Sequence, residues 1–311
     1  MQTKAELWYP AAASHFGQDY SAEKADIYTL DGISQSRLQE AVRDANAEPG
    51  PHPLIVYSHG TSRWQRLSAT FLCSHLASNG YVVAAIDHYE TTGTGLKNDD
   101  VAKNRPADIT FLLNWVLADY ATGDIHLEPS RFGAIGYCLG GWTVLRALEA
   151  EPRIRAAVVH APAGDKDARP GVFSGSLTFK WKREIPVLFL VAENDTMTPY
   201  VGQQRLFKRV PSPKRAVVLR KADHMHFIDA VEEEHEFVRT LLWPKEMSWV
   251  SEEMHPVEHL CPGEKAQTFT AGLTRAFLDA NLLWKDDARH WFGDGVREKL
   301  LALGIDAIGS G

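Results

Sequence analysis

A cysteine flanked by glycines is the first feature of this sequence that could carry out chemistry. In the stretch "RFGAIGYCLGGW" (131–142), Gly136 and Gly140 lie two residues before and two residues after Cys138. A nucleophile on a sharp turn between a strand and a helix needs such glycines, because side chains at those two positions would collide. The turn would also place the thiol at a helix N-terminus, where the helix dipole favours a thiolate. The alternative is an inert thiol, since free cysteines are among the most buried residue types.

Two further residues follow Cys138 in the order that a catalytic triad on such a turn requires. Asp195, in "ENDTMTP", lies 57 positions after Cys138, and His224, in "KADHMHF", lies 29 positions after Asp195. Each comes just after an apolar run with the character of a strand. A parallel sheet would therefore bring both to the edge at which the nucleophile sits. We predict Cys138, Asp195 and His224 as the members of a triad for acyl transfer.

Acyl transfer also needs hydrogen-bond donors for the oxyanion that forms during the reaction. One donor is expected from the backbone N–H after the nucleophile, here that of Leu139. The second is expected from a loop after an earlier strand, and "PLIVYSHGTS" supplies that loop, with Thr61 as the candidate. The two tryptophans near these positions could equally belong to the core, as large aromatic residues usually do. The candidate pocket residues are His59, Trp64, Trp142, His226 and Phe227.

The elements that would position these residues alternate along the chain. From residue 53 onward, the strand-like runs are almost continuously apolar, as is typical of strands buried on both faces of a parallel sheet. The alternation with helical patterns predicts an α/β fold with a mostly parallel, doubly wound sheet and helices on both faces. We expect a single domain over residues 1–311. The expected strands are 5–10, 25–30, 53–58, 81–87, 132–136, 154–160, 186–192 and 215–220; the expected helices lie near 62–79, 106–120 (starting at Pro106), 139–151, 200–210 and 266–284.

Two segments interrupt this alternation. Residues 161–184 form a Gly-, Pro- and charge-rich stretch that carries Phe173, Phe179 and Trp181, and residues 231–264 form a second long insertion. Long loops are uncommon in compact domains unless they have a task such as covering a site. The two segments are therefore candidates for a partial lid, with peripheral packing as the alternative.

Composition and charge exclude several classes of protein. The 311 residues are 44% hydrophobic and 23% charged with a formal net charge of −7, so we expect no nucleic-acid partner. No apolar run approaches the roughly 20 residues of a membrane span, and the N-terminus has no apolar signal core. Three widely spaced cysteines without a CxxC pair fit a reducing compartment better than a disulfide framework. These features predict a cytoplasmic protein.

A histidine pair in "DHMHFIDAVEEEH" raises the question of a metal site. Zinc enzymes with an H-x-H core need further ligands at set spacings, and the strand–helix order of this chain belongs to another architecture. The stretch "TGTGLKN" lacks the G-K-[ST] of a phosphate loop. We therefore expect neither a metal nor a cofactor.

Seven motifs in matching order resemble the α/β-hydrolase superfamily, and within it the group that contains dienelactone hydrolases and bacterial relatives of platelet-activating-factor acetylhydrolase. They are "ELWYP", "YSHGTS", "AAIDHYETTG", "RPADITFLLN", "GYCLGG", "AENDTMTP" and "DHMHFID", and they span about residues 5 to 285. This resemblance implies Cys138 as nucleophile, His224 as general base and acid, and Asp195 as the carboxylate that orients it. It also implies that Leu139 and Thr61 donate the oxyanion N–H groups.

The resemblance also bears on two rival residues. Glu193 precedes Asp195 by two positions, but Asp195 lies in the turn. The group's pattern has a histidine three residues before a phenylalanine, and His224 satisfies it with Phe227, whereas His226 does not. Relatives of the acetylhydrolase type usually carry serine at the elbow, while dienelactone hydrolases carry cysteine but lack the long terminal extensions. The chain thus combines the overall sequence pattern of the acetylhydrolase-type relatives with the cysteine nucleophile of the dienelactone hydrolases.

The expected function is hydrolysis of a carboxylic ester, lactone or thioester through an acyl-cysteine intermediate. A small-molecule acyl substrate is the expected partner. The sequence does not decide between a monomer and a homodimer. One alternative is an acyltransferase or cyclase, which would use the same intermediate with an acceptor other than water. Others are a non-catalytic binding protein on this scaffold and a serine esterase that carries a Ser-to-Cys substitution at position 138.

Overall fold

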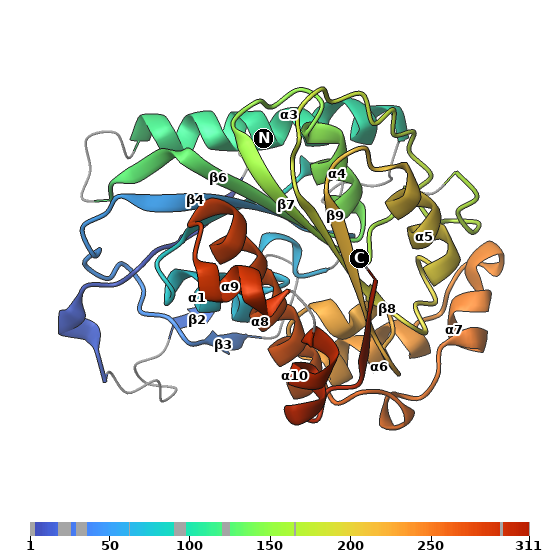
Figure 1. Ribbon diagram of the computed structural model, residues 1–311. Helices are drawn as coiled ribbons and strands as arrows, with labels where there is room; N and C mark the ends of the chain where they lie inside the picture. The colour runs from blue at the N-terminus through green and yellow to red at the C-terminus, as the bar shows by residue number, and fades with distance from the viewer. Residues whose placement is uncertain are drawn as a thin grey trace.

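An eight-stranded, mostly parallel sheet organises the molecule (Figure 1). The computed structural model describes residues 4–17, 26–28, 36–61, 63–89, 98–119, 125–164, 166–292 and 295–310. The strand order is β1-β5-β4-β6-β7-β8-β9-β10, in which the six inner strands run parallel and the edge strands β1 and β10 are antiparallel to their neighbours. The strands are β1 (Ala5–Trp8), β4 (His52–Ser58), β5 (Val82–Ile86), β6 (Leu127–Tyr137), β7 (Ile154–His160), β8 (Val187–Ala192), β9 (Lys214–Leu219) and β10 (Ala307–Ser310).

Burial explains why the inner strands read as apolar runs. Every residue of β4, β5 and β8 is buried, because helices cover both faces of the sheet. On one face α3 and α4 pack against each other and against the central strands, and on the other α1 and α8 do so. The predicted doubly wound α/β fold is confirmed. The helices are α1 (Thr70–Ala77), α3 (Asn98–Asp119), α4 (Leu139–Ala147), α5 (Tyr200–Arg209), α6 (Val231–Thr240), α7 (Trp249–Glu253), α8 (Gly263–Leu282), α9 (Asp286–Trp291) and α10 (Val296–Ala302).

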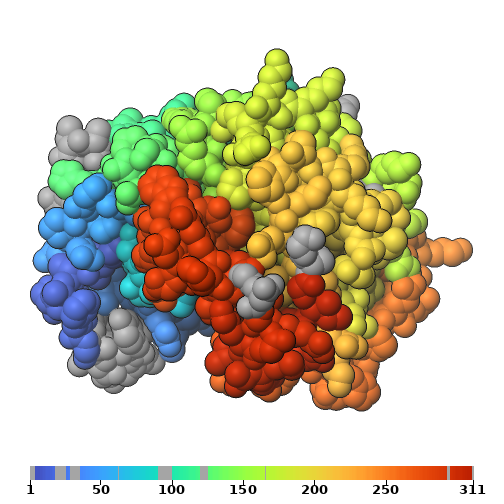
Figure 2. Space-filling view, in the orientation of Figure 1, coloured from blue at the N-terminus to red at the C-terminus, as the bar shows by residue number. Residues whose placement is uncertain are grey.

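The C-terminal part of the chain covers the front of the sheet. In Figure 2 the segment from α8 to α10, coloured orange to red, lies between the blue N-terminal part and the yellow region of α5 and β9. The final strand β10 then pairs antiparallel with β9 and closes that edge. No helix within the described ranges is long and apolar enough to cross a membrane.

Several details differ from the expectations. The helix expected near 62–79 begins only at Thr70, and the segment 231–264, expected as a long loop, contains α6 and α7. Pro106 does not start a helix but lies inside α3, which begins at Asn98. A proline in a helix removes one backbone hydrogen bond, a loss that tertiary packing can offset. The run expected as a strand at 25–30 forms β2 (Asp26–Tyr28) in a separate ribbon with β3 (Arg37–Gln39), and its residues 25, 29 and 30 lie outside the described part. The short edge strand β10 was not expected.

Candidate active site

The turn between β6 and α4 has the geometry that the glycine pattern predicts. Cys138 follows the last residue of β6 and precedes the first of α4, with φ 54° and ψ −119°. A non-glycine residue with positive φ is strained, and such strain is concentrated at functional sites. The main chain anchors this turn, because the Cys138 N–H donates to His160 O at 2.9 Å and its carbonyl accepts from Ala163 N at 2.9 Å. The thiol is free and 9% exposed.

The flanking glycines are required by space as well as by the turn. A Cβ at Gly136 would lie 2.1 Å from the carbonyl oxygen of Gly140, and a Cβ at Gly140 would lie 1.8 Å from the carbonyl oxygen of Ser58. A Cβ at Gly60 would lie 2.8 Å from Cβ of Cys138. The elbow and the loop after β4 are therefore packed main chain against main chain, which brings the Cys138 thiol beside that loop.

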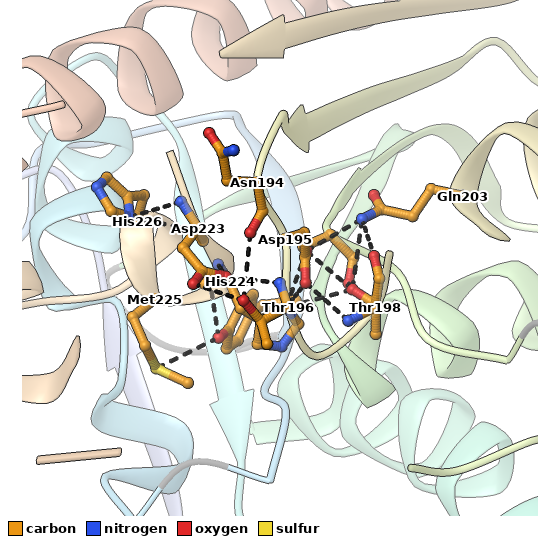
Figure 3. Close-up of polar contacts among 11 residues, drawn as sticks. Asn194, Asp195, Thr196, Thr198, Gln203, Asp223, His224, Met225 and His226 are labelled. Atoms are coloured by element: carbon orange, nitrogen blue, oxygen red, sulfur yellow. Dashed lines mark hydrogen bonds and ion pairs between the residues drawn. The ribbon is translucent and has the colours of Figure 1, made fainter. Parts of the chain in front are cut away.

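The structure brings the three predicted triad residues together. Asp195 lies in the turn after β8, and His224 begins a short 3₁₀ helix (His224–Phe227) after β9. His224 Nδ1 is 3.0 Å from both carboxylate oxygens of Asp195 (Figure 3), and His224 lines one cleft together with Cys138. The carboxyl ends of parallel strands meet at one edge, so residues separated by 86 positions can share a site.

The charge state of His224 follows from its surroundings. Burial alone lowers the pKa of His224, because it disfavours the imidazolium. The Asp195 carboxylate and the Cys138 sulfur outweigh this effect and raise the pKa of His224 well above its ordinary value. The pair of Cys138 and His224 is thus suited to nucleophilic attack followed by proton transfer.

Two residues that sequence reasoning missed hold Asp195 in place. Thr198 donates to Asp195 twice, through its N–H at 2.7 Å and its hydroxyl at 2.9 Å. Gln203, on α5, donates through Nε2 to Asp195 Oδ2 at 3.0 Å (Figure 3). Three donors leave the carboxylate oriented toward the His224 ring. Thr198 was within reach of sequence reasoning as the third residue after the acid, whereas no sequence pattern marks Gln203.

A second aspartate couples the two turns that carry the acid and the histidine. Asp223 accepts from the N–H of His224 at 2.6 Å, and from Thr196 through its N–H at 2.7 Å and its hydroxyl at 2.9 Å. Tyr137, next to the elbow, donates its hydroxyl to the carbonyl of His224 at 3.2 Å. The main chain of His224 is therefore fixed from the side of β6 as well as from the side of β8.

A cleft of about 160 Å³ opens beside Cys138. One wall comes from the loop after β4, and another comes from α6 and the residues that follow it as far as Trp243, which belong to the segment 231–264. None of residues 161–184 is in this lining, among those that the structure describes. The lining residues are Thr61, Arg63, Tyr137, Cys138, Met197, His224, Met225, Glu234, Phe237, Val238, Leu241 and Trp243.

The two tryptophans predicted to line the pocket are buried in the core and lie outside this lining. The Trp64 indole donates to Glu234 Oε1 at 2.8 Å, so Trp64 supports the cleft from behind by holding α6. Trp142 packs edge-on against Phe173 of the segment 161–184 at a centroid distance of 4.8 Å. Trp142 therefore packs against that segment, whereas Trp64 packs toward α6, and neither tryptophan lines the cleft.

The other three predicted pocket residues are also buried away from the cleft lining. His59 hydrogen-bonds to main-chain atoms behind the loop after β4. His226 contacts the carbonyl of Cys261 through Nε2 at 3.0 Å, and burial lowers the pKa of His226 to about 4. Phe227 stacks on His160 at 5.7 Å. Leu139 and Thr61 are placed as predicted, at the start of α4 and at the rim of the cleft.

A larger cavity, of about 360 Å³, lies elsewhere, between β1 and the β2–β3 ribbon. Three of its charged residues pair with one another, since Arg43 pairs with Glu6 and with Asp26. The smaller cleft is the candidate active site, because it alone of these two contains Cys138 and His224.

Known proteins resemble this chain over most of its length. Platelet-activating factor acetylhydrolase from Gallus gallus is 22% identical over 50% of this chain and 51% of its own length, so the chain spans about half of that relative. The structure of the ferulic acid esterase from Streptomyces cinnamoneus has the same fold, with a TM-score of 0.66 and 23% identity, and covers 91% of this chain and 83% of its own. The family model of PET hydrolase-like proteins matches residues 53–275, a range that includes the elbow and both of its partners. The chain therefore has the α/β-hydrolase fold and belongs to the PET hydrolase-like family.

Proposed function

We propose that this protein hydrolyses a carboxylic ester through Cys138, with His224 as acid and base and Asp195 as the residue that orients it. One observation carries the proposal: a strained cysteine on the elbow shares a cleft with a histidine whose Nδ1 is 3.0 Å from both oxygens of a buried carboxylate. The same arrangement of nucleophile, base and orienting group recurs in acyl-transfer enzymes on unrelated folds. Membership of the PET hydrolase-like family supports ester hydrolysis as the reaction.

In the first half-reaction, the Cys138 sulfur attacks the ester carbonyl carbon and a C–S bond forms. The oxyanion accepts hydrogen bonds from the N–H of Leu139, which begins α4 and so has no intrahelical partner, and from that of Thr61. The C–O bond then breaks, and the His224 imidazolium gives its proton to the leaving alkoxide. The products are an alcohol and a thioester on Cys138.

In the second half-reaction, His224 takes a proton from water and the hydroxide attacks the thioester. Acylation has removed the charge on the sulfur, one of the two influences that raise the pKa of His224, so the neutral imidazole is then available as a base. The C–S bond breaks, the carboxylic acid leaves, and the thiolate and imidazolium are restored. Asp195 stabilises the cationic ring in both steps.

The size of the cleft favours a short acyl group. Pockets that bury drug-sized ligands occupy about 300–1,000 Å³, and this cleft has about 160 Å³. Its lining is apolar at Met197, Phe237 and Leu241, which suits an unbranched alkyl or small aromatic acyl group. We therefore propose esters of short acyl chains as the substrates, with the larger alcohol portion outside the cleft.

The test is rapid-mixing kinetics with p-nitrophenyl acetate. We expect a burst of nitrophenol equal to the enzyme concentration, followed by steady release with acetate as the product. Added amine or alcohol acceptors should leave acetate as the main product. A main product acetylated on the added acceptor would indicate an acyltransferase instead. No release with a panel of esters and thioesters would indicate a binding protein and overturn the proposal.

The pH profile provides a separate prediction. Although burial opposes it, Asp195 and Cys138 keep the pKa of His224 well above 6.5, so the imidazolium persists above that pH. For an alkyl ester, whose leaving group needs a proton, the alkaline limb of the kcat/KM profile should lie well above pH 6.5. Asp195→Asn removes the negative charge, lowers the pKa of His224 and should move this limb to lower pH. An alkaline limb at the same pH in wild type and variant would contradict this account.

A further inference from the structure

Three of the sequence motifs have no role in the triad, yet they meet in one buried polar network. "YSHGTS" contributes Ser58 and His59, "AAIDHYETTG" contributes His88, and "RPADITFLLN" contributes Arg105 and Asp108. Ser58, His59, His88 and Arg105 are completely buried. Buried polar groups are costly unless they are hydrogen-bonded, so a network of this kind fixes the main chain that it contacts.

Arg105 binds the main chain of the loop after β4. Its side chain extends from α3 and donates to the carbonyl of His59 at 2.8 Å and to the carbonyl of Gly60 at 3.4 Å. A guanidinium presents its donors in a rigid planar fork, so two neighbouring carbonyls are held in a defined orientation. A lysine could not reproduce this, because it is a compact charge on a flexible stem.

The ring of His59 holds the same peptide from the other side. Its Nε2 accepts from the N–H of His88 at 3.2 Å, so the proton of the neutral ring is on Nδ1, which donates to the carbonyl of Gly60 at 2.7 Å. Burial, followed by the charge of Arg105, lowers the pKa of His59 well below its ordinary value, which agrees with a neutral ring. The carbonyl of Gly60 is therefore held by two donors that both lie in the interior.

The orientation of one peptide plane follows from these contacts. A trans peptide is planar, and its N–H points opposite to its C=O. Because the carbonyl of Gly60 points toward His59 and Arg105, the N–H of Thr61 points away from the interior. Thr61 lines the cleft together with Cys138, and Gly60 packs directly against Cys138. We propose that Arg105 and His59 are positioning residues, which hold the Gly60–Thr61 peptide so that its N–H is aimed at the oxyanion.

The remaining members of the network support His88, and through it His59. His88 Nδ1 lies 2.7 Å from Asp108 Oδ2, and its Nε2 lies 2.9 Å from the hydroxyl of Ser58. This serine, histidine and aspartate have the contact order of a catalytic triad. Ser58 and His88 are, however, completely buried, so a substrate cannot reach the hydroxyl. Their contacts fix the His88 main chain, whose N–H sets the tautomer of His59.

The test separates oxyanion stabilisation from the reactivity of the cysteine, and it rests on the proposed ester hydrolysis. Acylation by p-nitrophenyl acetate passes through an oxyanion, whereas alkylation by iodoacetamide is a displacement that needs the thiolate but no oxyanion donor. We expect Arg105→Lys and His59→Gln to lower the acylation rate by about 10- to 100-fold. This effect is no larger than that of removing one oxyanion donor completely, because the Thr61 N–H is misdirected rather than lost. KM should stay within about 3-fold, because the effect is confined to the transition state. The alkylation rate of Cys138, read by peptide mass spectrometry, should remain within about 2-fold of the wild type.

Arg183→Met is the matched control for the loss of an arginine that binds carbonyls. Arg183 donates to four carbonyl oxygens, including those of Glu151 and Ile154 at 3.0 Å, near the start of β7 and therefore at the opposite edge of the sheet. It should leave acylation unchanged. Equal losses of acylation and alkylation in the Arg105 and His59 variants would indicate general distortion and overturn the proposal, as would unchanged acylation. If Arg105→Lys does not fold, His59→Gln decides by the same comparison. Failure of wild-type acylation would instead count against the proposed function.

Discussion

His224→Ala is expected to lower kcat for ester hydrolysis by on the order of 10⁴-fold, or about 5 kcal/mol of transition-state stabilisation. In the proposed mechanism the ring supplies the proton for the leaving group and later removes one from water; among the described residues that line the cleft with Cys138, His224 is the histidine that contacts Asp195. The measurement is steady-state kinetics with an alkyl ester. The rate is divided by the concentration of folded protein, so that a loss of stability is not counted as a loss of kcat. Because the cysteine remains, residual turnover should be greater with p-nitrophenyl esters, whose leaving group needs little protonation.

His226→Ala is the matched control, since His226 was the rival for the same role. His226 is buried and its Nε2 contacts the carbonyl of Cys261, so its loss should reduce stability. The cost is about 1–3 kcal/mol for the groups left unpaired. Its kcat per folded molecule should stay within a few-fold of the wild type. A larger loss of kcat in His226→Ala than in His224→Ala would reverse the assignment.

Gly140→Ala is expected to disrupt the elbow. The added methyl group would lie 1.8 Å from the carbonyl oxygen of Ser58 and 2.8 Å from that of His59, and backbone atoms cannot rotate away as side chains can. We expect the free energy of unfolding to fall by about 3 kcal/mol or more, measured in urea, because overpacking of this kind forces the backbone to move. Activity should fall with it, because α4 carries the N–H of Leu139.

Gly272→Ala gives the matched comparison for the same chemical change. Gly272 lies within α8, and a Cβ there would meet nothing within 4 Å. Alanine is favoured over glycine inside a helix, so this variant should gain about 0.5–1 kcal/mol. If Gly140→Ala had the stability and activity of the wild type, the elbow would accommodate a Cβ at position 140, and this prediction would be wrong.

The proximity of Cys138, Asp195 and His224 could be predicted from the sequence because each of them follows a strand of the parallel sheet. The strand order places the ends of β6, β8 and β9 at one edge whatever the loops between them do. The glycine spacing was equally informative, since the space at Gly136 is limited by the turn itself and the space at Gly140 by the carbonyl of Ser58 at the end of β4. These features depend on local geometry and on the sheet alone.

The pocket could not be predicted, because it depends on which segment packs over the sheet. Trp64 faces Glu234, which lies 170 positions later in the chain, and no local pattern encodes this contact. Trp142 is covered by Phe173, whereas Phe237 and Trp243 reach the cleft from the other insertion. Both insertions read alike in the sequence, as long stretches with aromatic residues, and only their packing distinguishes them.

The most direct test of the account is to find the acyl group on Cys138. The protein is mixed with p-nitrophenyl acetate, quenched in acid during the burst, and analysed by intact-protein mass spectrometry and peptide mapping. Cys261→Ala serves as the control for a partly exposed thiol. We predict one acetyl group on Cys138 in the wild type and in Cys261→Ala, and none in Cys138→Ala, which should also lose turnover.

An acetyl group that persists in Cys138→Ala, or that maps to another residue while turnover continues, would contradict the central claim. The variant Cys138→Ser is measured in the same way. If it turned over much faster than the wild type, the cysteine would be a substitution in a serine esterase. We predict that Cys138→Ser turns over more slowly than the wild type, because the proposed imidazolium–thiolate pair depends on the sulfur of Cys138.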